Sequence, residues 1–278
     1  NLEKALADSP EKDRVLEGLR GWVEGYEGNW AEAERTLRAR YDANQTDLNT
    51  AQALAVALTK LDRAADAEKL LKEFAERQKD QPEAWTLLGQ FYLSRGAEQS
   101  LDEASSAFTQ ASLVVPDYGP ALRGLIDVQV RKNNRGTALS LCDRYLSGQP
   151  DDVDMLYRKA VLLAQDRNKL QDALSAIDRA IKSSERPEFL LARSSFNLTR
   201  AKPADALKDL QRFTELGGNV TADVDLTMAE IYLSLNERDL ARQYCDSARQ
   251  KANKTPPSDA TRLERVEKRI EEESQKKP

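Results

Sequence analysis

The chain of 278 residues contains no histidine, two cysteines, and 42 basic and 47 acidic side chains, for a formal net charge of -5. Without histidine it lacks the side chain that most often acts as a general base or binds a metal ion, so we expect no metal, no cofactor and no catalytic residues. The two signs of charge are mixed, which gives no basic stripe for nucleic acid. No apolar run approaches the roughly 18 residues that span a bilayer, so we predict no membrane insertion of this fragment.

The composition favours helices. Alanine, leucine and charged residues are common, whereas glycine (12 residues) and proline (10 residues) are scarce. Runs of β-branched and aromatic residues that alternate with polar ones are absent. We therefore predict an all-α fold.

A short pattern recurs along the chain, namely an alanine followed four residues later by an apolar residue or a cysteine. The steps between successive alanines are 34, 37, 34, 35, 33 and 35 residues. An amphipathic stretch precedes each occurrence, so each unit is predicted to contain two helices. One helix pair cannot bury its apolar face alone, and stacked pairs form a continuous core. The seven alanines are Ala33, Ala67, Ala104, Ala138, Ala173, Ala206 and Ala241.

In chain order, the sequence predicts a partial repeat, seven full units and a final helix. Leu2, Ala5 and Pro10 have the spacing of a second helix, so we expect the chain to be a piece of a longer array. The last segment is charged and carries a thin apolar stripe, which is typical of a capping helix, although a linker to a further domain is an alternative. The segments are residues 1–11 (the end of a preceding second helix), 12–47, 48–81, 82–116, 117–150, 151–186, 187–219 and 220–255 (the seven units), and 256–278 (the capping helix or linker).

The third unit shows the clearest motif. Its first helix is predicted to carry Trp85, Leu88, Gly89 and Tyr92 along one face, with Gly89 small enough for a second helix to cross closely. Phe108 on that second helix is predicted to fill the gap between units. The step into this unit is 37 residues, so we also expect a longer turn between its two helices.

The order of Trp85, Leu88-Gly89 and Tyr92, followed by Ala104, Phe108 and Pro116, resembles the tetratricopeptide repeat. This resemblance implies a right-handed α-solenoid of stacked antiparallel helix pairs. It also implies that the first helices line a concave groove that binds a protein or peptide. The groove positions that it points to are Gln52, Gln90, Arg123, Asp127, Arg131, Tyr157 and Arg158, with Trp22 and Tyr26 as possible aromatic anchors, and Asn49, Lys60, Ser195 and Glu230 beside them.

Two of these groups allow two interpretations each. Arg123, Asp127 and Arg131 lie on one helix face, where they could form a solvated ladder or offer two guanidinium groups to a partner carboxylate. With Tyr157 and Arg158 they would form a polar centre for binding. Trp22 and Tyr26 could anchor a partner or pack against an upstream repeat. The Lys and Asn set with which some relatives clamp a C-terminal carboxylate is not present in order, so we predict no such binding.

Other short motifs are explained without catalysis. Ser9 and Lys12 form a Ser-x-x-Lys match, but nothing near them would build an oxyanion hole. Gly217-Gly218 is predicted to end a helix, and Asp151-Asp152 to begin one. Cys142 and Cys245 are predicted to be buried apolar residues in separate units, too far apart for a disulfide.

The sequence thus leaves two functional hypotheses. The first is a non-catalytic scaffold that binds a peptide or partner protein in the concave groove. The alternative is a structural or assembly module, either a homo-oligomer or a spacer arm such as the periplasmic part of a bacterial export or secretion machine. Both the cytoplasm and the bacterial periplasm remain open as compartments.

Overall fold

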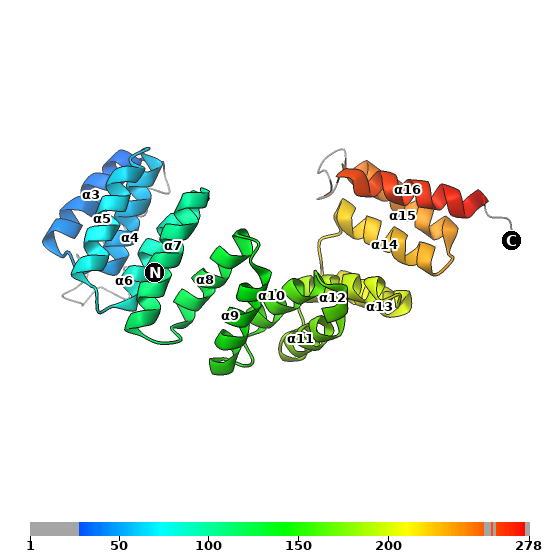
Figure 1. Cartoon of the computed structure of the whole chain (residues 1–278). Coiled ribbons are helices and arrows are strands. Elements are labelled where there is room, and N and C mark those ends of the chain that lie inside the picture. Colours follow the sequence, from blue (N-terminus) through cyan, green and yellow to red (C-terminus); the bar gives the residue numbers. More distant parts are fainter. Residues whose placement is uncertain (1–27, 253–256, 258–259, 276–278) are drawn as a thin grey trace, which may run out of the picture. The chain divides into compact units, whose positions relative to one another are not determined.

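A computed structural model describes residues 28–252, 257 and 260–275 (Figure 1). Within these ranges the regular structure is entirely helical. The predicted anchors Trp22 and Tyr26 lie outside the described residues. The helices are α3 (Trp30–Ala43), α4 (Leu48–Lys60), α5 (Ala64–Arg77), α6 (Pro82–Arg95), α7 (Glu98–Val114), α8 (Gly119–Arg131), α9 (Arg135–Gly148), α10 (Val153–Ala164), the 3-10 turn η1 (Arg167–Lys169), α11 (Leu170–Ser183), α12 (Pro187–Thr199), α13 (Pro203–Glu215), α14 (Ala222–Ser234), α15 (Arg238–Ala252) and α16 (Ala260–Gln275).

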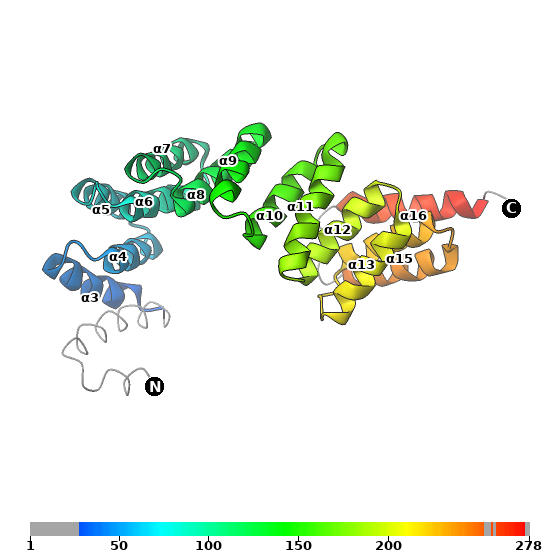
Figure 2. The same ribbon diagram turned by 90° about the horizontal axis from the view of Figure 1, so that it is seen from below.

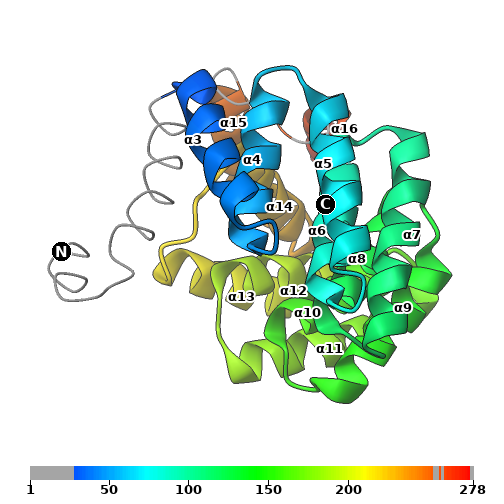
Figure 3. The ribbon, with the colours of Figure 1, turned by 90° about the vertical axis from the view of Figure 1, so that its left-hand side faces the viewer.

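The chain divides into two compact units at Tyr145, within α9, and we describe each by itself. In the first unit each helix packs against the next from α3 to α8, and α3 and α4 lie side by side in Figure 3. In the second unit α10, α12 and α14 pack against α11, α13 and α15. Stacked helix pairs are therefore the building block of both units, as the sequence predicted.

Helix starts follow ordinary capping chemistry. The Asp47 carboxylate caps α4 by accepting hydrogen bonds from the backbone N–H groups of Asn49 and Thr50, which satisfies donors that have no partner inside the helix. Asp152 caps α10 in the same way through the N–H of Met155, at 2.9 Å. The predicted role of Asp151-Asp152 at a helix start is thus confirmed for Asp152.

The turn between the two helices of a pair has a repeated backbone conformation. In four connections the middle residue adopts the left-handed region, and the N–H of the next residue donates back to a carbonyl five residues earlier, as Arg63 does to Leu58 at 2.9 Å. This pairing satisfies helix-end carbonyls and reverses the chain. Gly217 has a φ of 75° after α13, which confirms the predicted helix end. The four residues are Asp62, Asn133, Ala201 and Asn236, with φ of 58°, 57°, 56° and 64°.

The third unit departs from this pattern, and the expected longer turn is wrong. Only Gly96 and Ala97 join α6 to α7, whereas α7 itself extends over 17 residues. Ser100 and Leu101 in its added first turn are buried. The additional residues lengthen the helix because that turn gains apolar contacts that a loop would lack.

The core of the first unit is built around Phe108, which is fully buried. A Cβ atom at Gly89 would lie 2.7 Å from the Phe108 ring, and one at Gly124 would overlap the ring still more closely. Phe108 therefore fills the gap between α6 and α8, as predicted, and both glycines are required by its ring. Gly124 was not singled out in the sequence.

In the second unit, α16 packs against α14 and α15, and α15 and α16 lie side by side in Figure 1 and Figure 2. Val266 and Ile270 are buried in a cluster that includes Cys245 of α15. The Arg262 guanidinium of α16 pairs with Glu230 of α14 at 2.8 Å. Arg249 of α15 pairs in turn with Glu267 of α16 at 2.6 Å, so an apolar stripe and two ion pairs attach the last described helix to the pair before it.

Candidate functional site

Helix α6 lines two pockets of the first unit with opposite faces. Side chains on one face form a pocket with α4, and side chains on the other form a groove with α5 and α7. Residues three or four apart share one face of a helix, which explains this division. The α4/α6 pocket is lined by Gln52, Ala55, Val56, Thr59, Lys60, Leu71, Leu87, Gln90, Phe91 and Ser94. The α5–α7 groove is lined by Lys72, Glu76, Trp85, Leu88, Tyr92, Glu103, Ser106, Ala107 and Gln110.

The α4/α6 pocket has a volume of about 220 Å³ and a largely apolar floor. Leu87 and Phe91 of α6 are each 8% exposed there, and Val56 of α4 is half-buried. The hydroxyl groups of Thr59 and Ser94 donate to carbonyls of their own helices, so they present little free polarity to the pocket. An aliphatic side chain from a partner would be stabilised by leaving water for such a floor, and few polar groups of the pocket would lose hydration when it enters.

Two predicted groove residues meet at this pocket. Gln52 of α4 and Gln90 of α6 are both exposed at its rim, and neither side-chain amide has a hydrogen-bond partner among the described residues. An amide offers two donors and an acceptor, which suits the backbone of an extended peptide. Lys60 adds a positive charge at the rim. The geometry brings together an apolar anchor site and polar groups that could orient a peptide.

The predicted Arg123, Asp127 and Arg131 set is engaged within the first unit. The Arg123 guanidinium donates to the Tyr145 hydroxyl at 2.9 and 2.7 Å and lies 4.8 Å from the centre of the same ring. Arg131 donates to the backbone carbonyl of Leu93, at the end of α6, at 2.6 Å. Asp127 is half-buried. Both arginines therefore tie α8 to neighbouring elements.

Tyr157 and Arg158 lie on α10 in the second unit. The Tyr157 ring packs against Phe189 with centroids 5.1 Å apart, and burial raises the pKa of its hydroxyl. Arg158 is half-buried. These two residues belong to a different unit from Arg123, so a shared polar centre stays a prediction.

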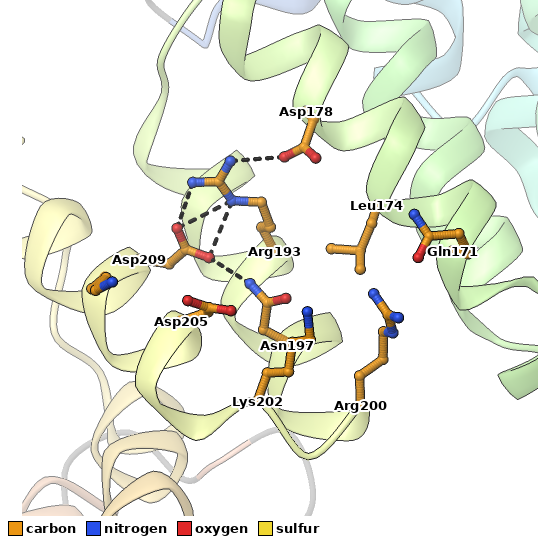
Figure 4. A pocket seen from close by; sticks show the side chains of 10 residues that line it. Gln171, Leu174, Asp178, Arg193, Asn197, Arg200, Lys202, Asp205 and Asp209 are labelled. Atoms are coloured by element: carbon orange, nitrogen blue, oxygen red, sulfur yellow. Dashed lines mark hydrogen bonds and ion pairs between the residues drawn. The ribbon is translucent and has the colours of Figure 1, made fainter.

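A third pocket lies in the second unit, where Arg193 of α12 is held between α11 and α13 (Figure 4). Its guanidinium donates to both oxygens of Asp209, with the shortest contact 2.6 Å, and to Asp178 at 2.8 Å. Asn197 donates to the same Asp209 at 3.1 Å. Burial opposes the charge on Arg193, but the hydrogen bonds of Asp209 and Asp178 outweigh it and raise the pKa of the guanidinium.

This Arg193 pocket and the α5–α7 groove occupy the same place in two different repeats, each between consecutive second helices. Counting from Pro82 and Pro187, Arg193 stands at the position of Leu88, and Asn197 at that of Tyr92. Counting from the helix alanines, Asp209 stands at the position of Ala107. A partly buried ion pair thus replaces an apolar pair. The sequence signal was an arginine where the repeat motif has leucine, and the sequence analysis did not use it.

Within the residues that the structure describes, no cluster of three potential metal-binding side chains occurs. None of the described helices is both long and apolar enough to cross a bilayer. Both cysteines are buried and neither forms a disulfide, and burial raises the pKa of the Cys245 thiol to about 11.

Stacked helix pairs, with no strand among the described residues, define an all-α helical-repeat solenoid. Residues 53–100 and 124–188 match the family model of the tetratricopeptide repeat. Together with the motif of the third unit and the fold, this match shows that the chain contains tetratricopeptide repeats. The family and fold are those of protein–protein interaction scaffolds, which are generally non-catalytic.

Similar proteins support the same fold. Protein FlbA of Caulobacter vibrioides is 28% identical over 184 residues, which cover 66% of this chain and 30% of that protein. A tetratricopeptide repeat protein from Parabacteroides merdae superimposes with a TM-score of 0.59 at 14% identity, over 92% of this chain and 98% of that one. PilW, described as a widely conserved type IV pilus biogenesis factor, gives 0.62 at 16% identity, over 79% and 97%.

Proposed function

We propose that this chain is a non-catalytic scaffold that binds an extended segment of a partner protein through the α4/α6 pocket. The partner would insert one aliphatic side chain between Val56, Leu87 and Phe91. The observation that carries the proposal is the pairing of this apolar floor with two exposed amides on successive first helices.

The energetics suit a single-anchor interaction. Full burial of one large aliphatic side chain contributes about 1.5–3 kcal/mol, and a few well-packed residues carry most of the binding energy of an interface. The Gln52 and Gln90 amides would then fix the direction of the peptide backbone. We expect modest affinity for any one peptide and clear selectivity for an aliphatic side chain at the anchor position.

The test uses a library of random linear peptides displayed on phage and selected on the whole chain. The variant Val56→Lys places a charged side chain over the pocket floor. Val161→Lys is the matched control, because Val161 follows the capping Asp152 of α10 at the spacing at which Val56 follows Asp47. Val161 is 36% exposed, so the control change should be tolerated.

We expect the selected peptides to share an aliphatic residue, to lose at least tenfold in affinity for Val56→Lys, and to bind Val161→Lys as they bind the unchanged protein. Equal binding to all three proteins would refute the pocket as the binding site. Circular dichroism of both variants checks that the fold is kept.

The assembly alternative remains a second candidate from the sequence. PilW is named as a pilus biogenesis factor, but at 16% identity the likeness concerns the fold alone. Sedimentation of the same variants separates the two hypotheses. Self-association that survives Val56→Lys, together with failure to select any peptide, would favour assembly.

A further inference from the structure

The α5–α7 groove has an aromatic floor in a fixed orientation. The indole N–H of Trp85 donates to the backbone carbonyl of Lys79 at 2.9 Å, which holds the ring in place while the side chain stays half-buried. Tyr92 is 3% exposed, and Leu88 and Ala107 complete an apolar surface. The groove has a volume of about 390 Å³ and lies on the face of α6 opposite to the α4/α6 pocket.

The charges around this floor do not balance. Lys72 is already paired with Glu68 at 2.8 Å, and it lies 5.9 Å from the centre of the Tyr92 ring. Glu76 of α5 is exposed and Glu103 of α7 half-buried at the rim. Neither carboxylate has an ion-pair partner within the described part of the chain. The groove therefore presents two uncompensated negative charges beside an aromatic face.

The Arg193 pocket, which occupies the equivalent place in the second unit, provides a comparison for the charges of the α5–α7 groove. There Arg193 is held by Asp178 and Asp209, so that charge is neutralised inside the protein. In the α5–α7 groove the corresponding arginine is absent, since Leu88 stands at its position. The Arg193 pocket thus contains its own guanidinium group, whereas Lys72, the basic residue among those that line the α5–α7 groove, is already paired with Glu68.

We propose that the α5–α7 groove docks a basic segment of a partner protein, with one arginine or lysine side chain lying over Trp85. The aliphatic stem packs on Trp85 and Leu88, and the cationic head lies between Glu76 and Glu103. An aromatic face attracts a cation, long basic side chains bury their stems on apolar surface, and opposite charge sets the choice of partner. This surface is separate from the α4/α6 pocket, so one partner can occupy it while another occupies that pocket.

The test uses the whole chain labelled with ¹⁵N-tryptophan and two small probes. The probes are N-acetyl-arginine amide and N-acetyl-citrulline amide, which have nearly the same shape and differ in charge. The indole signal of Trp85, assigned with Trp85→Phe, reports binding. The double variant Glu76→Gln, Glu103→Gln removes the rim charges. Glu73→Gln is the control, because Glu73 is exposed on the same helix but does not line the groove.

We expect the arginine probe to shift the Trp85 signal in a saturable way, with millimolar affinity that weakens at high salt. The citrulline probe should bind at least fivefold more weakly. The double variant should lose at least fivefold in affinity for the arginine probe, while Glu73→Gln and Val56→Lys keep theirs.

Three results would overturn the proposal. They are an unshifted Trp85 signal, equal effects of the two probes, and equal losses for the double variant and Glu73→Gln. A fourth result would overturn the choice of a partner protein as the molecule that binds in the groove. If the protein alone dimerises at high concentration and the double variant does not, the groove is filled by a second copy of this chain rather than by another protein.

Discussion

Phe108 occupies the space in which a side chain at Gly124 would lie. Phe108 belongs to α7 and Gly124 to α8, and the ring also lies against Gly89 of α6. One aromatic ring thus sets the distance between two repeats, and two glycines make room for it. Interiors packed this closely tolerate added atoms poorly.

Gly124→Ala is therefore expected to destabilise the first unit by about 2 kcal/mol, because the new methyl group displaces the Phe108 ring. Stacked repeats open locally, so hydrogen exchange of the α6, α7 and α8 amides is the appropriate measurement. Gly136→Ala on α9 is the control, since nothing lies within 4 Å of its Cβ position. It should stabilise by about 0.5–1 kcal/mol through helix propensity. Equal effects of the two changes would disprove the steric argument.

The Arg193–Asp209 pair predicts strong coupling between its two residues. Asp209→Ala leaves Arg193 without its main partner in a site where the Asp209 side chain is only 6% exposed, and should destabilise the second unit by about 3 kcal/mol. Adding Arg193→Leu recreates the Leu88 and Ala107 pair of the first unit and should recover most of the loss. A double-mutant cycle in urea measures this coupling. Additive losses from the two changes would contradict the account.

Ala201 is the one alanine among the four left-handed turn residues given above, and this conformation is unfavourable for a residue with a Cβ atom. Ala201→Gly should stabilise the protein by about 1 kcal/mol. Ala192→Gly, in the middle of α12, should instead destabilise it by about 1 kcal/mol. Thermal unfolding followed by circular dichroism measures both. A lower melting temperature for Ala201→Gly would show that backbone strain at this turn is not the dominant effect.

Asp47 predicts a specific pH dependence. Burial opposes ionisation of its carboxyl group, but hydrogen bonds from Thr50 and the nearby Arg40 outweigh burial and lower its pKa. A group whose folded pKa is lowered adds stability above its unfolded pKa of about 3.9, and this stability is lost as the pH falls through the folded value. Asp47→Ala should thus cost about 1 kcal/mol at pH 7.

The difference in unfolding free energy between Asp47→Ala and the unchanged protein should shrink as the pH falls below about 4. Urea midpoints at pH 7 and pH 3 test this. A difference that is equal at both values would mean that the cap does not depend on the charge of Asp47.

The sequence by itself determined the helical repeat, because the spacing of alanines and apolar residues decides which helix faces must be buried. The resemblance to the tetratricopeptide repeat also implied that Gln52 and Gln90 are groove positions on successive first helices, and the motif of the third unit indicated the ring of Phe108 as the filler between repeats. These properties depend on contacts within one helix or between adjacent repeats of known register.

The tertiary structure decided which polar groups are free. Arg123 and Arg131 look equally available in the sequence, yet one binds the Tyr145 hydroxyl and the other the Leu93 carbonyl. The carboxylates Glu76 and Glu103 come to line one groove with Trp85 because α5 and α7 both pack against α6. Helical periodicity places a side chain on a face, but its charge balance depends on residues from other repeats, whose side chains meet only when the helices stack.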